Sequence, residues 1–196
     1  MIRTRMILVL VAAMAYFTPA YAGTYRIDED HTSISFSVKH MMIFDVKGHF
    51  GLFSGTFDFD EDKALFTSAK ADIFTETINT GSEKRDKVLR SEDFFDVKKY
   101  PDIYFTLKRS KSPGGNHIHA VGDITIRGIT REVALDGEYR GSVVDFEGNK
   151  RVGFTAKGVL KRGDFGMLWN EPLKSGGYLV GEDVNISLEI EGIKNK

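Results

Sequence analysis

The chain contains no cysteine, only four prolines and no strong excess of either charge. The lack of cysteine excludes disulfides, zinc–thiolate sites and thiol nucleophiles. With 27 basic and 28 acidic residues, the chain has neither the basic surface typical of nucleic-acid binding nor a polybasic membrane patch. After residue 22 no apolar run is long enough to cross a bilayer, so we expect the mature chain to be soluble.

The first residues have the pattern of a secretory signal peptide. Arg3 and Arg5 precede the apolar run 6–17, which is too short for a membrane-spanning helix. Ala20 and Ala22 place small residues where a signal peptidase reads them, so cleavage is predicted after Ala22. An uncleaved anchor is the less favoured alternative, and a lipoprotein would need a cysteine. In a double-membraned bacterium, this signal predicts the periplasm.

Residues 23–196 are expected to form one domain, because they can enclose a sizeable core and contain no linker or internal repeat. Apolar and polar residues alternate in about eight stretches of this domain, as in half-buried β-strands. The apolar stripes are Ile34, Phe36 and Val38; Gly55, Phe57 and Phe59; Ala69, Ala71 and Ile73; Ile103, Phe105 and Leu107; Ala120, Gly122, Ile124 and Ile126; Val133, Leu135 and Tyr139; Val152, Phe154 and Ala156; and Val184, Ile186, Leu188 and Ile190.

Short turn-forming segments separate several of these stretches, at 112–116, 127–130 and 148–149. The spacing is typical of an antiparallel β-sandwich or β-barrel, and closure into a barrel removes exposed strand edges. The fold class is therefore all-β. Residues 82–96 differ, since helix formers fill 83–90, and they predict a short helical connection across one mouth of the barrel.

The inward stripes mix large and small side chains. Phenylalanines such as Phe36 and Phe105 alternate along the chain with alanines such as Ala71 and Ala120. Large and small residues can interdigitate into a solid core, or they can leave a tunnel lined by rings. Both readings stay open from periodicity alone. If a tunnel exists, its nearly uncharged lining selects a ligand that is mostly hydrocarbon.

A series of short motifs runs along essentially the whole mature chain. They are Tyr25, Asp28, His31 and 36–40; Gly48, Phe50, 54–56 and Asp60; Arg85, Asp86, 89–96, Tyr100, Pro101 and Phe105; 122–130; and Arg162, 164–167 and 181–184. In this order and spacing the motifs resemble the YceI-like family. The chain departs from the family at Val88, where many members carry histidine, so an apolar contact is expected there.

The resemblance implies a lipocalin-like, eight-stranded antiparallel barrel that is usually periplasmic. It implies binding of a long apolar lipid (a polyisoprenoid, an isoprenoid quinone or a fatty amide) for transport, storage or stress protection. No enzymatic activity is established for the family as a class. We therefore expect a lipid ligand, no cofactor, no catalytic residues and no nucleic-acid partner. A homodimer and a membrane-protein acceptor are compatible with the resemblance.

The inward stripes and the resemblance together predict a set of ligand-binding residues in the barrel and at its mouth. These are Phe36, Val38, His40, Phe57, Ala71, Ile73, Phe94, Phe95, Phe105, Ile124, Phe154, Phe165 and Trp169. Arg85 and Asp86, with Arg90 and Asp93 close by, could position a ligand head group at the mouth. They are interpreted instead as a salt-bridge and capping cluster that ties the helical connection to the strands. Arg162 is likewise expected to support a strand end. The loop between Trp169 and Tyr178 is interpreted as a flap or an entrance rim.

Three alternatives compete with lipid binding. His117 and His119 share one strand face, but no third ligand is evident, so we expect no metal site there. An enzyme acting on isoprenoid-type lipids would need a catalytic motif, and the sequence has no nucleophile elbow or phosphate-binding loop. A solid barrel that docks onto a membrane complex through its surface is the third alternative.

Overall fold

The structure is a computed structural model that describes residues 22–195. The predicted signal peptide, apart from Ala22, lies outside the described residues. The strands are β1 (Gly23–Ile27), β2 (Ser33–His40), β3 (Phe44–Phe50), β4 (Phe53–Asp60), β5 (Leu65–Phe74), β6 (Ile78–Asn79), β7 (Asp102–Gly114), β8 (His117–Ile126), β9 (Ile129–Val144), β10 (Lys150–Lys161) and β11 (Val180–Lys194). One α-helix, α1 (Glu83–Leu89), and two 3-10 turns, Thr75–Thr77 and Arg162–Phe165, complete the described part. Within it, no helix is long and apolar enough to span a membrane.

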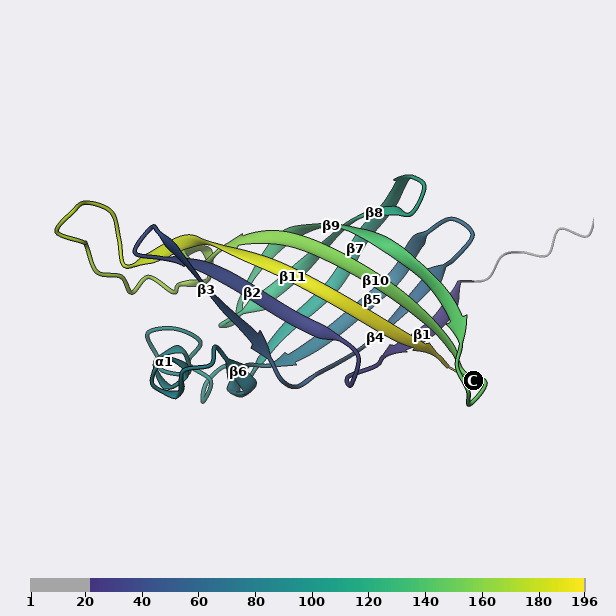
Figure 1. The fold of residues 1–196 in the computed structure, drawn as a ribbon, viewed down its shortest axis with the longest axis horizontal. Helices are drawn as coiled ribbons and strands as arrows, with labels where there is room; N and C mark the ends of the chain where they lie inside the picture. Colours follow the sequence, from purple (N-terminus) through teal and green to yellow (C-terminus); the bar gives the residue numbers. More distant parts are fainter. Residues whose placement is uncertain (1–21, 196) are drawn as a thin grey trace, which may run out of the picture.

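The strands form one antiparallel sheet that closes into an eight-stranded barrel (Figure 1). β1 and β2 both pair with β11, so they are two halves of one bent strand. β3 and β4 likewise follow each other with only Gly51 and Leu52 between them. The ring then continues through β5, β7, β8, β9 and β10 to β11. The predicted fold class, strand number and helical connection are confirmed.

The sequence stripes at 34–38 and 55–59 correspond to β2 and β4 and miss the other halves, β1 and β3. The bend between β1 and β2 depends on contacts far along the chain. Asp28 accepts a hydrogen bond from Arg151 of β10, and the backbone N–H of Asp28 donates to the Glu191 carbonyl of β11. No local sequence signal announces these partners. β3, by contrast, carries the same alternation as its neighbours.

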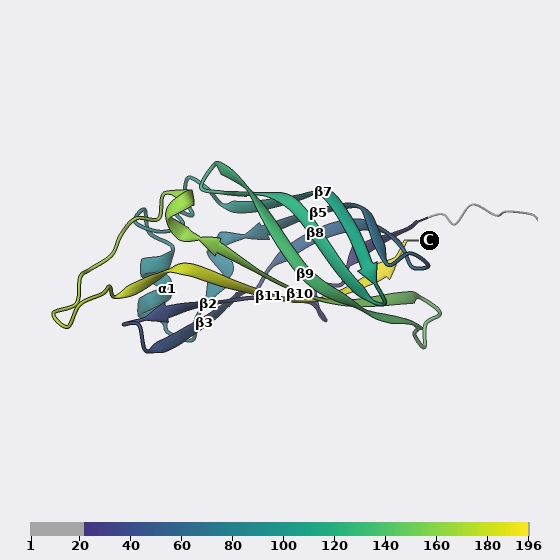
Figure 2. The same cartoon turned by 90° about the horizontal axis from the view of Figure 1, so that it is seen from above.

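The barrel wall is interrupted beside β3 and covered there by the segment between β5 and β7. β3 pairs with the short strand β6 through His49 with Asn79 and Phe50 with Ile78. α1 follows β6 and lies at this end of the barrel, together with the β2–β3 hairpin and the β10–β11 loop (Figures 1 and 2). We call this end the mouth. The predicted helical connection therefore lies at a mouth of the barrel.

The opposite end is filled by aromatic rings, mainly Phe57, Phe59, Phe66 and Phe154. The Phe59 and Phe154 rings meet edge to face, with centroids 4.7 Å apart, and the Phe66 and Phe154 rings are 4.8 Å apart. Such ring pairs stabilise beyond their buried area. A second apolar cluster, with Phe50, Ile78 and Phe165 among its members, lies nearer the mouth.

The β2–β3 hairpin turns through two methionines in the left-handed backbone region, Met41 with φ of 50° and Met42 with φ of 65°. The Ile43 N–H donates to the His40 carbonyl across this turn, at 3.2 Å. Three residues, 41–43, connect the paired residues His40 and Phe44. A turn with two successive residues in the left-handed region favours Asn-Gly, because other side chains are less stable there by about 1–2 kcal/mol per residue. The local sequence is therefore unfavourable for the turn that it forms.

Candidate functional site: an apolar cavity

A cavity of about 780 Å³ lies inside the barrel. Its lining includes members of both apolar clusters, from Phe154 at the aromatic end to Phe165 nearer the mouth. Ligand pockets in proteins commonly measure about 300–1,000 Å³, so this one has room for a sizeable molecule. Of the two interiors that periodicity left open, the structure has the tunnel.

All of the predicted ligand-binding residues contribute to the cavity lining, namely Phe36, Val38, His40, Phe57, Ala71, Ile73, Phe94, Phe95, Phe105, Ile124, Phe154, Phe165 and Trp169. That they bind a ligand stays a prediction. Five further lining residues were not among the predicted ligand-binding residues, namely Ile34, Leu107, Leu135, Ile186 and Leu188. Each of these belongs to an alternating stripe, so the same period-two signal could have identified them.

Small residues keep the centre of the barrel open. Ala71 lies between Gly55 of β4 and Phe105 of β7, and it lines the cavity. The Phe105 ring covers Gly122 of β8, where an added Cβ would lie only 2.4 Å from the ring. The ring thus fills the position that a larger side chain would need. Because the Phe105 ring packs over Gly122 and Ala71 has only a methyl group, the space in front of Ala71 remains part of the cavity.

Charge is sparse in the lining and of one sign. Among the described residues that line the cavity, the charged ones are Lys39, Lys70, Lys84, Arg85 and Arg162, and none is an aspartate or a glutamate. Lys39 pairs with Asp45 at 3.0 Å, outside the lining. Arg85 donates through Nε to the Thr80 hydroxyl at 2.7 Å. Lys70 lies in the middle of β5 and is exposed, whereas Lys84 and Arg85 belong to α1. A bound molecule therefore meets mostly hydrocarbon along the barrel and these two cations at the mouth.

The mouth is framed by α1, the following turn and the β10–β11 loop. Val88 lines the cavity from α1 and is still 44% exposed, as expected at an opening. The Phe94 and Trp169 rings approach each other across the mouth, with centroids 5.7 Å apart. Both residues line the cavity. Val88 therefore provides the apolar contact that was expected at this position.

Arg162 fixes the β10–β11 loop from beneath and is 3% exposed. Its Nη1 donates to the carbonyls of Met167 at 2.5 Å and Trp169 at 2.9 Å, and its Nη2 pairs with Glu182 at 2.8 Å. Its Nε donates to the Gly181 carbonyl at 2.9 Å. These contacts agree with a supporting role at a strand end, and they hold Trp169 at the mouth.

The charged residues of α1 tie the helix to β6. The Asp86 carboxylate is buried and accepts hydrogen bonds from the Thr80 backbone N–H at 2.9 Å and from its hydroxyl at 2.5 Å. Arg90 donates to the carbonyls of Glu76 and Ile78, each at 2.7 Å. Arg85, Asp86 and Arg90 therefore make hydrogen bonds that hold α1 against β6 and its flanking residues, in agreement with the structural interpretation.

At the closed end, Glu61 collects polar groups. Its carboxylate accepts hydrogen bonds from Tyr25 at 2.7 Å and Tyr139 at 3.1 Å, and it pairs with Lys150 at 2.6 Å. Burial would raise the pKa of Glu61, but the hydrogen bonds from Lys150 and Tyr25 outweigh it and lower the pKa to about 2. The ionised Glu61 carboxylate therefore links β1, β9 and β10 at the aromatic end.

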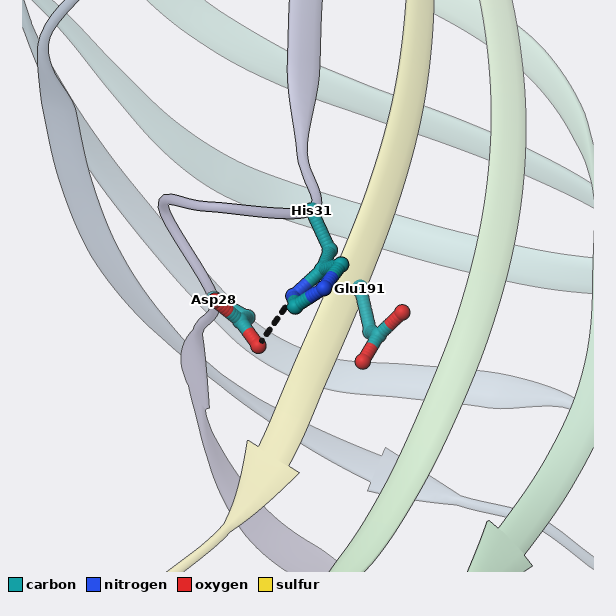
Figure 3. A group of neighbouring side chains, drawn as sticks. All are labelled: Asp28, His31 and Glu191. Atoms are coloured by element: carbon teal, nitrogen blue, oxygen red, sulfur yellow. Dashed lines mark hydrogen bonds and ion pairs between the residues drawn. The ribbon is translucent and has the colours of Figure 1, made fainter. Parts of the chain in front are cut away.

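Asp28, His31 and Glu191 form a cluster with metal-binding residue types (Figure 3). The Arg151 guanidinium already pairs with Asp28 and with Glu191, the latter at 2.6 Å. Burial would raise the pKa of Asp28, but hydrogen bonds from His31 and Arg151 lower it, while Asp28 raises the pKa of His31. The positive charge that balances these two carboxylates is the Arg151 guanidinium, and the cluster joins the β1–β2 bend to β10 and β11.

The two histidines of β8 each face a carboxylate on β9. His119 lies 2.6 Å from Asp136, and His117 lies 3.6 Å from Glu138. Each histidine therefore has its own carboxylate partner. A single cation would instead need the two rings and a third group to converge.

Comparison with known proteins agrees with this architecture. The family model described as the YceI-like domain matches residues 25–192. The chain belongs to this family. It is 33% identical to protein YceI of Escherichia coli O157:H7 over 179 residues, which cover 90% of each chain.

Solved structures share the barrel. A crystal structure of a Campylobacter jejuni YceI protein is 31% identical, covers 81% of this chain and 90% of its own, and superposes with a TM-score of 0.69. A Saccharophagus degradans domain described as polyisoprenoid binding is 12% identical, with a TM-score of 0.62, and covers 89% of this chain and 99% of its own. At that identity, the second likeness concerns the fold alone.

Proposed function

We propose that this YceI-like protein binds one long, mostly hydrocarbon lipid inside its barrel. The candidates are a polyisoprenoid, an isoprenoid quinone and a fatty amide. The observation that carries the proposal is the cavity of about 780 Å³, lined by aliphatic and aromatic side chains without a carboxylate among the described residues. The polyisoprenoid-binding description of the Saccharophagus degradans domain, which has the same fold, agrees with this ligand class.

Hydrophobic burial alone can supply the affinity. Each methylene removed from water contributes about 0.8 kcal/mol, so a chain that fills the barrel needs few polar contacts. We place the polar head group at the mouth, where Lys84 and Arg85 lie beside the opening. An anionic group or a carbonyl oxygen there would accept hydrogen bonds from these side chains.

Binding without catalysis accounts best for the lining. An enzyme acting on such a lipid needs a general acid, a general base or a nucleophile close to the ligand. The described lining offers no carboxylate, and the chain has no cysteine. His40 lines the cavity, but no carboxylate of the described lining stands beside it to form a catalytic pair. A solid barrel that works through its surface does not account for the cavity. Transport, storage and stress protection, the roles that the family resemblance implies, are the ones that we propose.

We further propose that the protein acts in the periplasm after cleavage behind Ala22. Cell fractionation combined with N-terminal sequencing tests this location, and Gly23 is the expected first residue. A protein retained in the cytoplasm, or a chain that keeps Arg3 and Arg5, would contradict it. A homodimer and a membrane-protein acceptor remain predictions from the family resemblance.

The ligand proposal is tested by native mass spectrometry of the protein purified without detergent, followed by solvent extraction. We expect one noncovalent lipid per chain, with a long hydrocarbon portion and a small head group. A chain that is empty as purified and stays empty after incubation with isoprenoid lipids would contradict the proposal. A ligand that is small and highly charged would contradict it equally.

A further inference from the structure

Exposed apolar side chains gather at the mouth of the barrel. Met41, Met42, Ile43 and Phe44 form the tip of the β2–β3 hairpin, and Leu168 projects from the β10–β11 loop. Ile43 is 84% exposed, Phe44 65% and Leu168 75%. We call these five residues the apolar rim. Isolated exposed apolar residues are ordinary, but a group at one end of a molecule marks an interaction surface.

The two segments that carry the rim lie side by side. The Met41 N–H donates to the Leu179 carbonyl at 2.8 Å, and β2 pairs with β11 through His40 and Val180. Figures 1 and 2 show the hairpin and the loop at the same end of the barrel, beside α1. The hairpin tip and the loop that carries Leu168 thus lie at the same end of the molecule.

Folding does not explain the two methionines. Both occupy the left-handed backbone region, where Asn-Gly would form the same turn with less strain. Their side chains are 44% and 57% exposed, so they gain little burial in return. Large apolar residues at a strained and exposed position indicate a contact made outside the chain.

The rim is continuous with the cavity. Three lining residues of the cavity adjoin the rim in sequence. His40 precedes Met41, Trp169 follows Leu168, and Leu179 ends the loop that carries Leu168.

α1 exposes Lys84, Arg85 and Lys87 at this end, against the exposed acid Glu83. The exposed acid beside the hairpin tip, Asp45, is neutralised by Lys39 at 3.0 Å, and the loop carries one exposed acid and one exposed base, Glu171 and Lys174. An apolar tip flanked by cations is complementary to a bilayer, which has hydrocarbon beneath phosphate groups.

We propose that the apolar rim inserts into the surface of a phospholipid bilayer and brings the mouth of the barrel against it. A hydrocarbon ligand then passes between bilayer and cavity without crossing water. The exchange step rests on the proposed lipid-binding function, whereas the docking step does not. Val143, Val144 and Phe146 form another exposed apolar tip in the β9–β10 hairpin at the closed end. This tip lies away from the mouth and Phe146 stands between two acids, Asp145 and Glu147, so we expect it not to insert into an anionic bilayer and use it as a control.

Docking is tested by flotation with large unilamellar vesicles of phosphatidylethanolamine and phosphatidylglycerol. The protein is used from residue 23 onward, because the apolar run 6–17 would itself bind vesicles and every strand of the barrel lies within 23–194. The variant M41N/M42G keeps the turn and relieves its backbone, so folding is preserved. We expect it to reduce the vesicle-bound fraction at least about tenfold. The control V144T/F146S should bind as the unaltered protein does.

Three results would overturn docking. One is equal flotation of the rim variant and the unaltered protein, and another is a loss confined to the control variant. The third is a protein that does not float but sediments as a dimer, with M41N/M42G sedimenting as a monomer, since a second copy would then cover the rim. A protein that floats yet carries no lipid overturns the lipid-binding function alone. A protein that takes up lipid from detergent without floating overturns docking alone.

Discussion

Replacing Ala71 with phenylalanine should divide the cavity into two parts. Ala71 lines the cavity from the middle of β5, between Gly55 and Phe105 on the neighbouring strands. An added ring at this position points into the lumen, because the alternate residues of the strand face outward. It should separate the mouth from the space above Phe66 and Phe154. The barrel itself loses no hydrogen bond.

The size of the effect follows from the displaced hydrocarbon. A phenyl ring takes up the room of about five methylenes, and each buried methylene contributes about 0.8 kcal/mol. The loss is about 4 kcal/mol, or about a thousandfold in Kd, for a ligand long enough to reach the aromatic end. A short ligand that stays near the mouth should bind Ala71→Phe almost unchanged.

Fluorescence titration with primary fatty amides of increasing length measures this difference. Trp169 is the only tryptophan and lines the cavity at the mouth, so its emission reports occupancy. Affinity should rise about fourfold per methylene until the chain reaches the aromatic end. In Ala71→Phe the rise should stop about five methylenes earlier. Ser68→Phe, at an exposed position of the same strand outside the lining, is the control. Equal length dependence in all three proteins would refute a ligand path past β5.

Three further predictions concern the frame of the cavity. Gly122→Ala should lower the free energy of unfolding by about 1–3 kcal/mol in urea titrations, because its Cβ would lie 2.4 Å from the Phe105 ring. Arg162→Met should cost about 3 kcal/mol in thermal denaturation and shift Trp169 emission to the red, because the loop carbonyls lose their donor. The lowered pKa of Glu61 contributes stability above its ordinary value near 4.5, and this contribution is lost as pH falls toward about 2. Glu61→Gln should therefore show a smaller loss of stability between pH 4.5 and 2.

Alternation was sufficient to predict an antiparallel sandwich or barrel, because most strands have one face toward the interior and one toward solvent, and the family resemblance added the eight-stranded barrel. The stripe Ile103, Phe105 and Leu107 is an example, and β7 extends it to Gly114. The bend at Asp28 was not predictable, because its partner Arg151 lies 123 residues away. The Met41–Met42 turn was equally hidden, since neither residue is typical of a left-handed turn.

Side-chain periodicity identified the cavity lining but could not predict the empty volume. Whether the interior is filled depends on where each ring lies. The Phe105 ring covers Gly122, and the Phe36 ring covers Gly48, where an added Cβ would also lie 2.4 Å away. Each of these contacts joins residues of two neighbouring strands, so it cannot be read from the sequence of one strand. The lipid class came from the family resemblance rather than from the stripes.

A crystal structure of the protein purified with its natural ligand tests the central claim most directly. We predict one elongated, unbranched or methyl-branched ligand in the barrel, with its tail against Phe154 and its head group near Arg85. Density for such a molecule should run past Ala71. A barrel in which side chains collapse into the cavity, or one that holds only ordered water along Phe36 and Phe105, would contradict the account.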